Sequence, residues 1–256
     1  ELAKTYGLDG PIVDVRPVSQ RFNHDLVFRI ADHRFIAKPG YQGWDKDLRR
    51  FKFGIQDHLH DVGYPVPRVY KTLAGDLIWD TEEDSIVLTD FIGEAYNPSR
   101  KKIQCASSAR ALGWFHRVGP SAPDIGTHYW DEDAEFEYTQ SHVHMSREWL
   151  MAKNLTASSQ KQALEVLDDL TALFEGVRTS LIQERYWELP HIPIHGAYHQ
   201  YHCRYEGDEV AAVIDWDTVR LAPRLHDLSR TIDIGIGWSS SLDDPYNFSW
   251  HYIDVP

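Results

Sequence analysis

One stretch of the sequence decides the fold: Pro193-Ile-His-Gly-Ala-Tyr-His-Gln-Tyr-His-Cys-Arg-Tyr-Glu-Gly-Asp-Glu-Val-Ala-Ala-Val-Ile-Asp-Trp-Asp217. The apolar run Ile192–His195 predicts a short strand, and Cys203–Tyr205 and Val210–Ile214 predict a hairpin that ends at Asp215 and Asp217. Carboxylates that follow an apolar strand can hold a hard cation. Mg²⁺ in proteins takes few carboxylates together with phosphate oxygens. The stretch therefore predicts a metal and nucleotide site at these two aspartates.

The first ninety residues have the pattern of a β-rich lobe with one helix. Apolar residues recur at spacings of three and four from Leu48 to Val62, which predicts one helical face with Gly63 as its stop. Polar turns separate five expected strands, at Ile12–Val18, Leu26–Ile30, Phe35–Lys38, Leu73–Trp79 and Ser85–Asp90.

After Gly93 the pattern changes to helices. Helical spacing of apolar residues predicts helices at Ile103–Arg117, Gln140–Met151 and Gln160–Leu189, the last with an apolar stripe that faces the core. We therefore expect a β-rich lobe over residues 1–92 and a larger α-rich lobe over residues 93–256.

The composition excludes several classes of protein. The 256 residues carry a formal net charge of −13 and two cysteines, Cys105 and Cys203, which argues against a disulfide scaffold and fits a reducing compartment. No apolar run is long enough to span a membrane, and the N-terminus lacks the regions of a signal peptide. The acidic balance argues against bulk nucleic-acid binding. We expect a cytoplasmic protein with neither a membrane nor a nucleic acid as its partner.

The central stretch resembles the aminoglycoside phosphotransferase/choline kinase-like family, whose members are relatives of the protein kinases. The family signature is His-Gly-Asp, a spacer and Asn, followed later by a hydrophobic-Asp-Trp/Phe segment, and His195-Gly196 and Asp215 match it in identity and spacing. Further matches occur in order along the chain, at Gly63–Val69, Leu88–Gly93, Ala109–His116 and Leu221–Ser229. The resemblance implies an α+β, two-lobed protein-kinase-like fold.

The resemblance also implies roles for residues of a cleft between the lobes. Lys38 is similar to the strand lysine that pairs with nucleotide phosphates, and Asp215 to the metal-binding aspartate. The hinge position is occupied by Thr89, Asp90, Phe91 and Ile92. The implied cofactors are ATP or GTP with Mg²⁺ or Mn²⁺. The implied acceptor is a hydroxyl of an aminoglycoside, of another natural product or of a peptide.

Two departures from the family pattern concern the catalytic loop. Ala197 stands at the position of the catalytic Asp, and an alanine side chain can neither accept a proton nor orient a hydroxyl. His202 stands at the position of the metal-binding Asn, and imidazole is a poor ligand for Mg²⁺ but a good one for softer divalent ions. Recognition of the fold therefore does not establish the activity.

Two further departures concern the nucleotide side of the cleft. The expected helix has Lys52 nearest to the position of the family's Glu, with Asp45 and Asp47 as imperfect substitutes. The loop from Val18 to Asp25 has no glycine where a turn that covers phosphates often has several.

Ala197 and the histidines of this loop leave three hypotheses about function open. In the first, a phosphotransferase with a degenerate loop keeps some activity, because phosphoryl transfer depends mainly on positioning, and His195, His199 or Asp217 positions the acceptor. In the second, the protein is a pseudokinase that binds nucleotide and regulates a protein partner. An engineered inactive variant would explain Ala197 but not His202. In the third, His195, His199 and His202 bind zinc in a metal-dependent hydrolase.

Two features concern the acceptor. The acidic run Asp131–Glu137 is a candidate for attracting a cationic substrate. Members of the family continue after the segment that Leu221–Ser229 matches, with helices that help to close the acceptor site, whereas residues 230–256 alone follow here. We therefore expect either an incomplete chain or a reduced acceptor site, and the sequence does not identify the substrate.

Overall fold

The structure is a computed structural model that describes residues 1–18, 25–40, 45–81, 84–93, 102–123, 128–153, 156–199 and 201–237. The chain divides into two compact units, one of Glu1–His128 with Ile192–Pro256 and the other of Tyr129–His191. The expected boundary near residue 92 falls within the first unit, and the division into lobes 1–92 and 93–256 stays a prediction. Within the part of the chain that is described, no helix combines the length and the apolar character that a membrane span needs.

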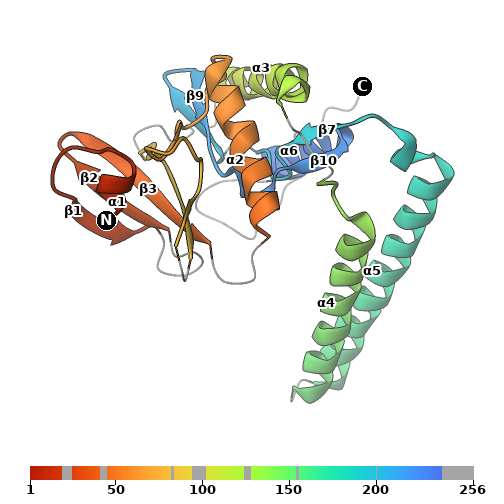
Figure 1. Ribbon diagram of the computed structural model, residues 1–256. Helices are drawn as coiled ribbons and strands as arrows, with labels where there is room; N and C mark the ends of the chain where they lie inside the picture. The colour runs from red at the N-terminus through yellow and green to blue at the C-terminus, as the bar shows by residue number, and fades with distance from the viewer. Residues whose placement is uncertain are drawn as a thin grey trace. The chain divides into compact units, whose positions relative to one another are not determined.

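An antiparallel sheet forms the N-terminal part of the first unit (Figure 1). Its order is β1-β2-β3-β6-β4, and β5 also pairs with β6. In the pairing of β3 with β6, Lys38 lies opposite Val87 and Phe35 lies opposite Asp90. The sheet therefore places Lys38 and the expected hinge on neighbouring strands. After the short helix α1 (Leu2–Thr5), the strands are β1 (Val13–Pro17), β2 (Leu26–Ile30), β3 (His33–Gly40), β4 (Val69–Tyr70), β5 (Trp79–Asp80) and β6 (Ser85–Asp90).

One expected strand, Leu73–Trp79, is wrong. Trp79 alone belongs to a strand, because the preceding residues form a turn in which the Thr72 amide donates to Asp76 O and the Asp76 amide donates to Thr72 Oγ1. Gly75 adopts φ of +92° in this turn, which an L side chain rarely allows. Leu73 is accordingly 77% exposed.

The expected helix after β3 is present as α2 (Lys46–Asp61). The side chain of Asp45 caps its first turn by accepting hydrogen bonds from the amides of Asp47 and Leu48, at 2.9 and 3.0 Å. Gly63 follows the helix with φ of +79°, in agreement with the expected stop. The buried face of α2 contains Phe51, Phe53, Ile55 and Leu59.

The main core of the first unit joins α2 to segments from the C-terminal part of the chain. Trp216 lies in the 3₁₀ turn η4 (Trp216–Thr218) and packs edge-to-face on Tyr64 and Phe115, with ring centroids 6.0 and 5.1 Å apart. Ile55 and Leu59 of α2 are buried in the same cluster. Aromatic pairs in this arrangement are favourable beyond the area they bury. The core therefore fixes the Asp215–Asp217 segment against α2.

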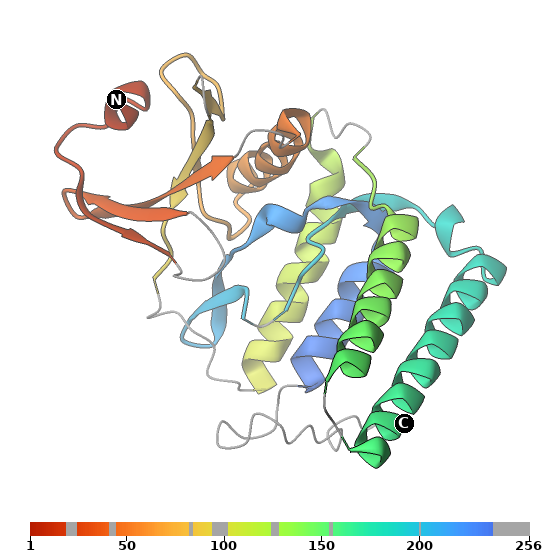
Figure 2. The same ribbon diagram turned by 90° about the horizontal axis from the view of Figure 1, so that it is seen from below.

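The remaining elements of the first unit surround that segment. Strand β7 pairs with β10, and β8 pairs with β9 as the expected hairpin. Helices α3 and α6 lie side by side, as Figure 2 shows. The elements are α3 (Lys102–Val118), η2 (Gly119–Ser121), β7 (His191–Ile194), β8 (Cys203–Glu206), β9 (Glu209–Val213), β10 (Arg220–Pro223) and α6 (Leu225–Gly237).

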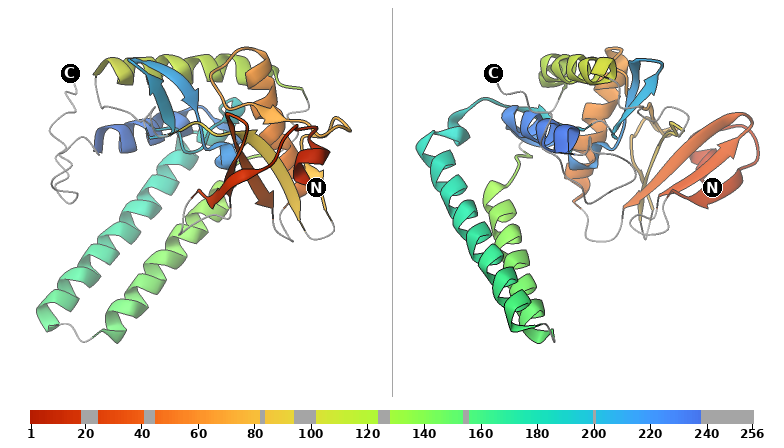
Figure 3. Two further views of the ribbon diagram at one scale, coloured as in Figure 1. Left: turned by 90° about the vertical axis from the view of Figure 1, so that its left-hand side faces the viewer. Right: turned by 180° about the vertical axis from the view of Figure 1, so that it is seen from behind.

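The second unit is a helical hairpin of α4 (Glu132–Ala152) and α5 (Ala157–Gln183), followed by η3 (Tyr186–Glu188). The two helices run side by side (Figure 3), and ion pairs join Arg147 to Asp168 and Arg178 to Asp133 across the pair. The acidic run at Asp131–Glu137 caps and begins α4. The expected burial of the α5 stripe is wrong, because no residue of α5 is buried and Leu173 is 61% exposed. A stripe that faces one neighbouring helix keeps its flanks in contact with solvent.

Candidate active site

A buried carboxylate, that of Asp227, binds the start of the loop after β7. Asp227 of α6 accepts hydrogen bonds from the backbone amides of His195 and Gly196, at 2.9 and 2.8 Å, and its Oδ2 lies 2.9 Å from Nε2 of His116. Burial alone would raise the pKa of Asp227, but the hydrogen bond with His116 and the neighbouring charges hold this pKa below its ordinary value. Asp227 therefore fixes the position from which the loop begins.

His195 is enclosed by this arrangement rather than open to a substrate. Its side chain has no exposed surface, and its Nε2 lies 2.9 Å from the backbone oxygen of Ile214. Burial, which is the largest influence, lowers the pKa of His195, so the ring is neutral near pH 7. A ring without exposed surface cannot contact an acceptor, so the hypothesis that His195 positions the acceptor loses its support.

The histidines after Ala197 form a stacked pair. The rings of His199 and His202 have centroids 3.8 Å apart. Burial, reinforced by the charge of His202, lowers the pKa of His199 to about 4. Nδ1 of His199 accepts a hydrogen bond from the Tyr201 amide at 3.2 Å, so the proton of the neutral ring lies on Nε2. In this conformation His199 has no free lone pair with which to act as a base.

His202 links Ala197 to the expected metal aspartate. Its Nδ1 lies 2.8 Å from the backbone oxygen of Ala197, and its Nε2 lies 3.0 Å from Oδ2 of Asp215. Both ring nitrogens are thus occupied by oxygen acceptors. The described residues include no group of three or more His, Cys, Asp and Glu side chains arranged to hold a metal ion. The arrangement therefore gives no support to a zinc centre formed by His195, His199 and His202.

Asp215 has the backbone geometry of a turn that presents its side chain outward. Its φ and ψ are 66° and 60°, in the left-handed region that few residues other than glycine adopt, and its side chain is 46% exposed. Burial opposes ionisation, but the hydrogen bond with His202 and the charges of His202 and Lys38 hold the pKa of Asp215 well below its ordinary value. Asp215 is therefore a carboxylate at any physiological pH.

Lys38 is held between two further carboxylates. Its Nζ lies 2.8 Å from Oδ2 of Asp217 and 3.9 Å from Oδ2 of Asp25. Burial lowers the pKa of Lys38, but the charges of Asp217 and Asp25 outweigh that effect and raise it. The pKa of Asp25 is itself raised, first by burial, while Lys38 lowers it and Asp217 and Asp215 raise it. Two carboxylates thus lie within 4 Å of the Lys38 ammonium group, and the charge of Asp215 also acts on it.

A cavity of about 250 Å³ brings these groups together with the hinge. Of the eight residues expected to bind nucleotide or metal, all except His202 line it: Lys38, Thr89, Asp90, Phe91, Ile92, Asp215 and Asp217. Ala197 and the three loop histidines are not part of its lining, although His202 contacts the lining residue Asp215. The lining also contains Arg16, Asp25, Gln56 and Arg204, which no sequence motif marks.

Asp90, a residue of the expected hinge, uses its side chain for contacts within the sheet. Its Oδ1 lies 2.7 Å from His33 Nε2 and accepts a hydrogen bond from the Tyr70 hydroxyl at 2.8 Å. Burial and this hydrogen bond raise the pKa of Tyr70 above its ordinary value, so the phenol stays protonated. The carboxylate of Asp90 is therefore occupied by His33 and Tyr70. Most of the loop between Val18 and Asp25 lies outside the described residues.

The cavity has the donor set that a magnesium-bound nucleotide needs. Asp215 and Asp217 are 46% and 53% exposed and offer hard carboxylate oxygens, while Lys38 offers an ammonium group on the same wall. A further cation would relieve the repulsion among Asp25, Asp215 and Asp217. The residues present thus fit a divalent cation and phosphate groups.

Comparisons with solved structures find proteins of similar fold. An aminoglycoside phosphotransferase from Alicyclobacillus acidocaldarius is 16% identical, and the match covers 91% of this chain and 71% of that chain with a TM-score of 0.64. Spectinomycin phosphotransferase in complex with ADP and spectinomycin is 19% identical, with 98% and 76% covered and a TM-score of 0.68. Amicoumacin kinase in complex with AMP-PNP, Ca²⁺ and Ami is 13% identical, with 93% and 68% covered and a TM-score of 0.57.

These structures confirm the expected α+β protein-kinase-like fold, with a β-rich sheet followed by a helical part. A search of curated proteins gives no match. The model of the phosphotransferase enzyme family, in contrast, matches residues 14–256. Because this match covers almost the whole chain, the protein belongs to the phosphotransferase enzyme family.

Proposed function

We propose that the protein binds a nucleoside triphosphate with a divalent cation in the 250 Å³ cavity and transfers the terminal phosphoryl group to a hydroxyl of a small molecule. The observation that carries this proposal is the placement of Lys38, Asp215 and Asp217 in one cavity with the hinge segment 89–92. Membership of the phosphotransferase enzyme family supports it. Solved relatives of the same fold bind ADP or AMP-PNP together with spectinomycin or amicoumacin, which favours a natural-product acceptor.

In this proposal each wall of the cavity binds a different part of the nucleotide. Thr89, Phe91 and Ile92 face the base, while the ammonium group of Lys38 meets the phosphates. Asp217 and Asp25 keep Lys38 protonated and direct its Nζ before the nucleotide enters. Asp215 and Asp217 would hold a divalent cation, which would supply positive charge to the phosphate oxygens.

The acceptor side of the mechanism depends on positioning rather than on a base. The methyl group of Ala197 cannot take the hydroxyl proton, and His199 in its neutral form has no free lone pair. Phosphoryl transfer through a loose transition state needs alignment and charge stabilisation more than proton abstraction. We therefore expect slow transfer from a loop that Asp227 and His202 hold in place.

A second candidate function is nucleotide binding without transfer. Ala197 favours this candidate, because it stands where the family has its catalytic Asp and its side chain has no functional group. The protein would then act as a pseudokinase that regulates or presents a partner. Binding of nucleotide is common to both candidates, and phosphate transfer separates them.

The first experiment measures nucleotide binding. ATP and GTP, each with Mg²⁺ or Mn²⁺, are titrated by calorimetry into the wild type and into Lys38→Ala. Loss of the charge-assisted bond to phosphate should weaken binding by about 10- to 100-fold. Lys46→Ala is the matched control, because Lys46 is an exposed lysine that pairs with Asp80. A wild type that binds neither nucleotide would overturn both candidate functions.

The second experiment measures transfer. Aminoglycosides, other hydroxyl-bearing natural products and Ser- or Thr-containing peptides are incubated with the nucleotide that binds, and phosphorylated products are detected by mass spectrometry. A phosphorylated small molecule supports the first candidate. Tight nucleotide binding without any product across these acceptors favours the pseudokinase.

A further inference from the structure

Helix α2 has no acidic side chain bound to Lys38, although the resembling family has a Glu in this place. Asp45 caps the helix, and Asp47 accepts a hydrogen bond from Arg50 at 3.1 Å. Among the described residues, the partners of the Lys38 ammonium group are Asp217 and Asp25 instead. Another contact must therefore hold α2 against the strand that carries Lys38.

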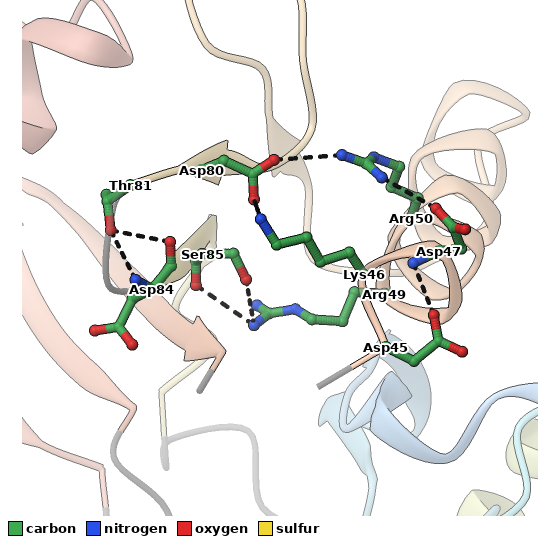
Figure 4. A network of polar contacts seen from close by, with 9 residues as sticks. All are labelled: Asp45, Lys46, Asp47, Arg49, Arg50, Asp80, Thr81, Asp84 and Ser85. Atoms are coloured by element: carbon green, nitrogen blue, oxygen red, sulfur yellow. Dashed lines mark hydrogen bonds and ion pairs between the residues drawn. The ribbon is translucent and has the colours of Figure 1, made fainter. Parts of the chain in front are cut away.

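Arg49 makes that contact through the backbone. Its Nη2 donates to the backbone oxygen of Lys38 at 3.0 Å. Its Nη1 donates to Ser85 Oγ at 3.0 Å and to the Ser85 backbone oxygen at 3.4 Å, as Figure 4 shows. The Arg49 side chain is buried, with 4% of its surface exposed. One guanidinium group from α2 thus joins β3 and β6 beside Lys38.

Gly40 provides a second, independent observation. A Cβ atom on Gly40 would lie 1.3 Å from Nη1 of Arg49 and 2.7 Å from Ser85 Oγ. Gly40 has no left-handed φ, so the backbone does not require a glycine here. Gly40 pairs with Ser85 in the sheet register. The glycine therefore leaves the space in which the guanidinium reaches its acceptors.

The contact suits arginine and no other cationic side chain. The planar guanidinium presents several N–H groups in a fixed fork and serves acceptors on two strands at once, which a lysine ammonium on a flexible stem does less well. The neighbouring cations Lys46 and Arg50 are more exposed and pair with Asp80 instead (Figure 4). Arg49 is thus the cation of α2 that is joined to the Lys38 strand.

We propose that Arg49 is a positioning residue for nucleotide binding: it fixes α2 and β3 together and thereby holds the Lys38 ammonium group in the cavity. In the family, a helix Glu holds this lysine by an ion pair. Here Arg49 holds the same strand by a hydrogen bond to the backbone oxygen of Lys38. The proposal rests on the proposed function, since it concerns the presentation of Lys38 to phosphate.

The first test needs no nucleotide. Hydrogen exchange of the backbone amides is compared among the wild type, Arg49→Met, Gly40→Ala and the control Arg50→Ala. Arg49→Met and Gly40→Ala should both speed exchange in β3 and α2, because one removes the guanidinium and the other displaces it. Arg50→Ala should not, because Arg50 is exposed and bonds Asp47 and Asp80 instead. Equal exchange in Arg49→Met and Arg50→Ala would overturn the proposal.

The second test asks whether Arg49 acts through Lys38. Binding of ATP with Mg²⁺ should weaken about tenfold or more in Arg49→Met, the factor that one charge-assisted hydrogen bond represents. In the Lys38→Ala background the same substitution should add almost nothing, because the group that Arg49 positions is gone. If Arg49→Met instead caused a general loss of structure, the affinity for ATP would fall by the same factor in both backgrounds. That result would contradict the proposal.

Two further outcomes can also be interpreted. If Arg49→Met does not fold, Ser85→Ala removes one acceptor and Arg49→Lys removes the fork, and each should produce the same changes in exchange and affinity to a smaller extent. Unchanged exchange in both would overturn the proposal. If the wild type binds no nucleotide, the proposed function fails, and the exchange experiment still decides whether Arg49 holds α2 on β3.

Discussion

Lys52 of α2 is the residue nearest to the position at which the family has a Glu. Within the described part of the chain no hydrogen bond or ion pair involves its ammonium group. Burial lowers the pKa of Lys52 to about 8, with a further decrease from Arg220 and an opposing increase from Asp217. The folded state therefore disfavours the charged form of this lysine.

The consequence for stability depends on pH. Below pH 8 both the folded and the unfolded chain carry the proton, so folding includes the full cost of burying the charge. Between this pKa and the ordinary value of 10.5 the folded state has lost the proton and the unfolded state has kept it, so this cost falls as pH rises. Lys52→Met should therefore raise the melting temperature at pH 7, and the gain should shrink towards pH 10.

Denaturation of Lys52→Met at pH 7 and pH 9.5 measures this effect. A gain of about 1 kcal/mol corresponds to roughly 2–4 °C for a chain of this size. Lys46→Met is the control, because Lys46 is 52% exposed and ion-paired, and its substitution should bring no gain that depends on pH. A lower melting temperature for Lys52→Met at pH 7 would show that its charge is compensated in the folded state.

Substitution of Ala197 by Asp should restore the side chain that the catalytic loop lacks. The backbone oxygen of Ala197 already fixes His202, so a longer side chain at this position leaves that hydrogen bond in place. Ala197→Asp adds a carboxylate that can accept the hydroxyl proton and orient the acceptor. We expect phosphate transfer to rise by about 10²- to 10⁴-fold, the range for one positioned acid–base group, while nucleotide affinity stays unchanged.

The comparison variant for this prediction is His199→Ala. In the structure His199 is neutral and its Nδ1 is occupied, so its removal should leave the transfer rate almost unchanged. If Ala197→Asp has no effect and His199→Ala abolishes transfer, the loop histidine performs the chemistry. The rates are measured at saturating nucleotide, so that a change in binding does not enter the comparison.

Asp227 acts at the scale of elements, because one carboxylate joins α6, α3 and the loop after β7. It is fully buried, and it bonds His116 and the amides of His195 and Gly196. Asp227→Asn should cost about 3–5 kcal/mol, the usual effect of removing one partner of a buried charge network. Chemical denaturation measures this loss, and Asp61→Asn, at an exposed position, serves as the control.

The same carboxylate gives the loss a definite pH dependence. The pKa of Asp227 is lowered from its ordinary value of 3.8, so its contribution to stability is complete above that value. The contribution is lost as pH falls through the lower pKa of the folded state. The difference between wild type and Asp227→Asn should therefore shrink as pH falls below 4. A constant difference down to pH 2 would contradict the carboxylate role.

Elements were predictable where the local pattern decides them. The hairpin before Asp215 and the capped helix α2 follow from alternation, apolar spacing and the Gly63 stop. The strand expected at Leu73–Trp79 fails because the Thr72 side chain and Gly75 favour a turn over the apolar pattern. The apolar stripe of α5 predicts a helix correctly, but periodicity does not reveal how much of a stripe its neighbours cover.

Residues of the candidate site can be predicted where a motif marks them. Contacts between residues that are distant in sequence cannot. Lys38 and Asp215 follow from motif resemblance, and the structure places them around one cavity. The bond between Lys38 and Asp217 joins residues 179 positions apart, so local patterns cannot predict it. Arg49 was missed because the family pattern directs attention to a helix Glu, and its signal was the pairing of a helix arginine with Gly40.

At the scale of the whole molecule the two compact units should differ in local stability. The first unit has a core in which Leu59, Phe115 and Val213 are fully buried. The hairpin of α4 and α5 has no buried residue in α5, and its cross-helix ion pairs, such as Arg147–Asp168, involve largely exposed carboxylates. Exposed ion pairs contribute little to stability, and segments with few buried apolar contacts open locally at low free energy.

Hydrogen exchange with and without nucleotide tests this difference. Amides of α4 and α5 should exchange faster than those of α2 and α3, because the hairpin opens without unfolding the core of the first unit. ATP with Mg²⁺ should slow exchange in β3, in residues 89–92 and around Asp215, because every residue that lines the cavity belongs to the first unit. The rates in Tyr129–His191 should stay the same. A bound ligand slows exchange only through openings that disrupt its site. Slower exchange of the hairpin with nucleotide would therefore contradict independent opening.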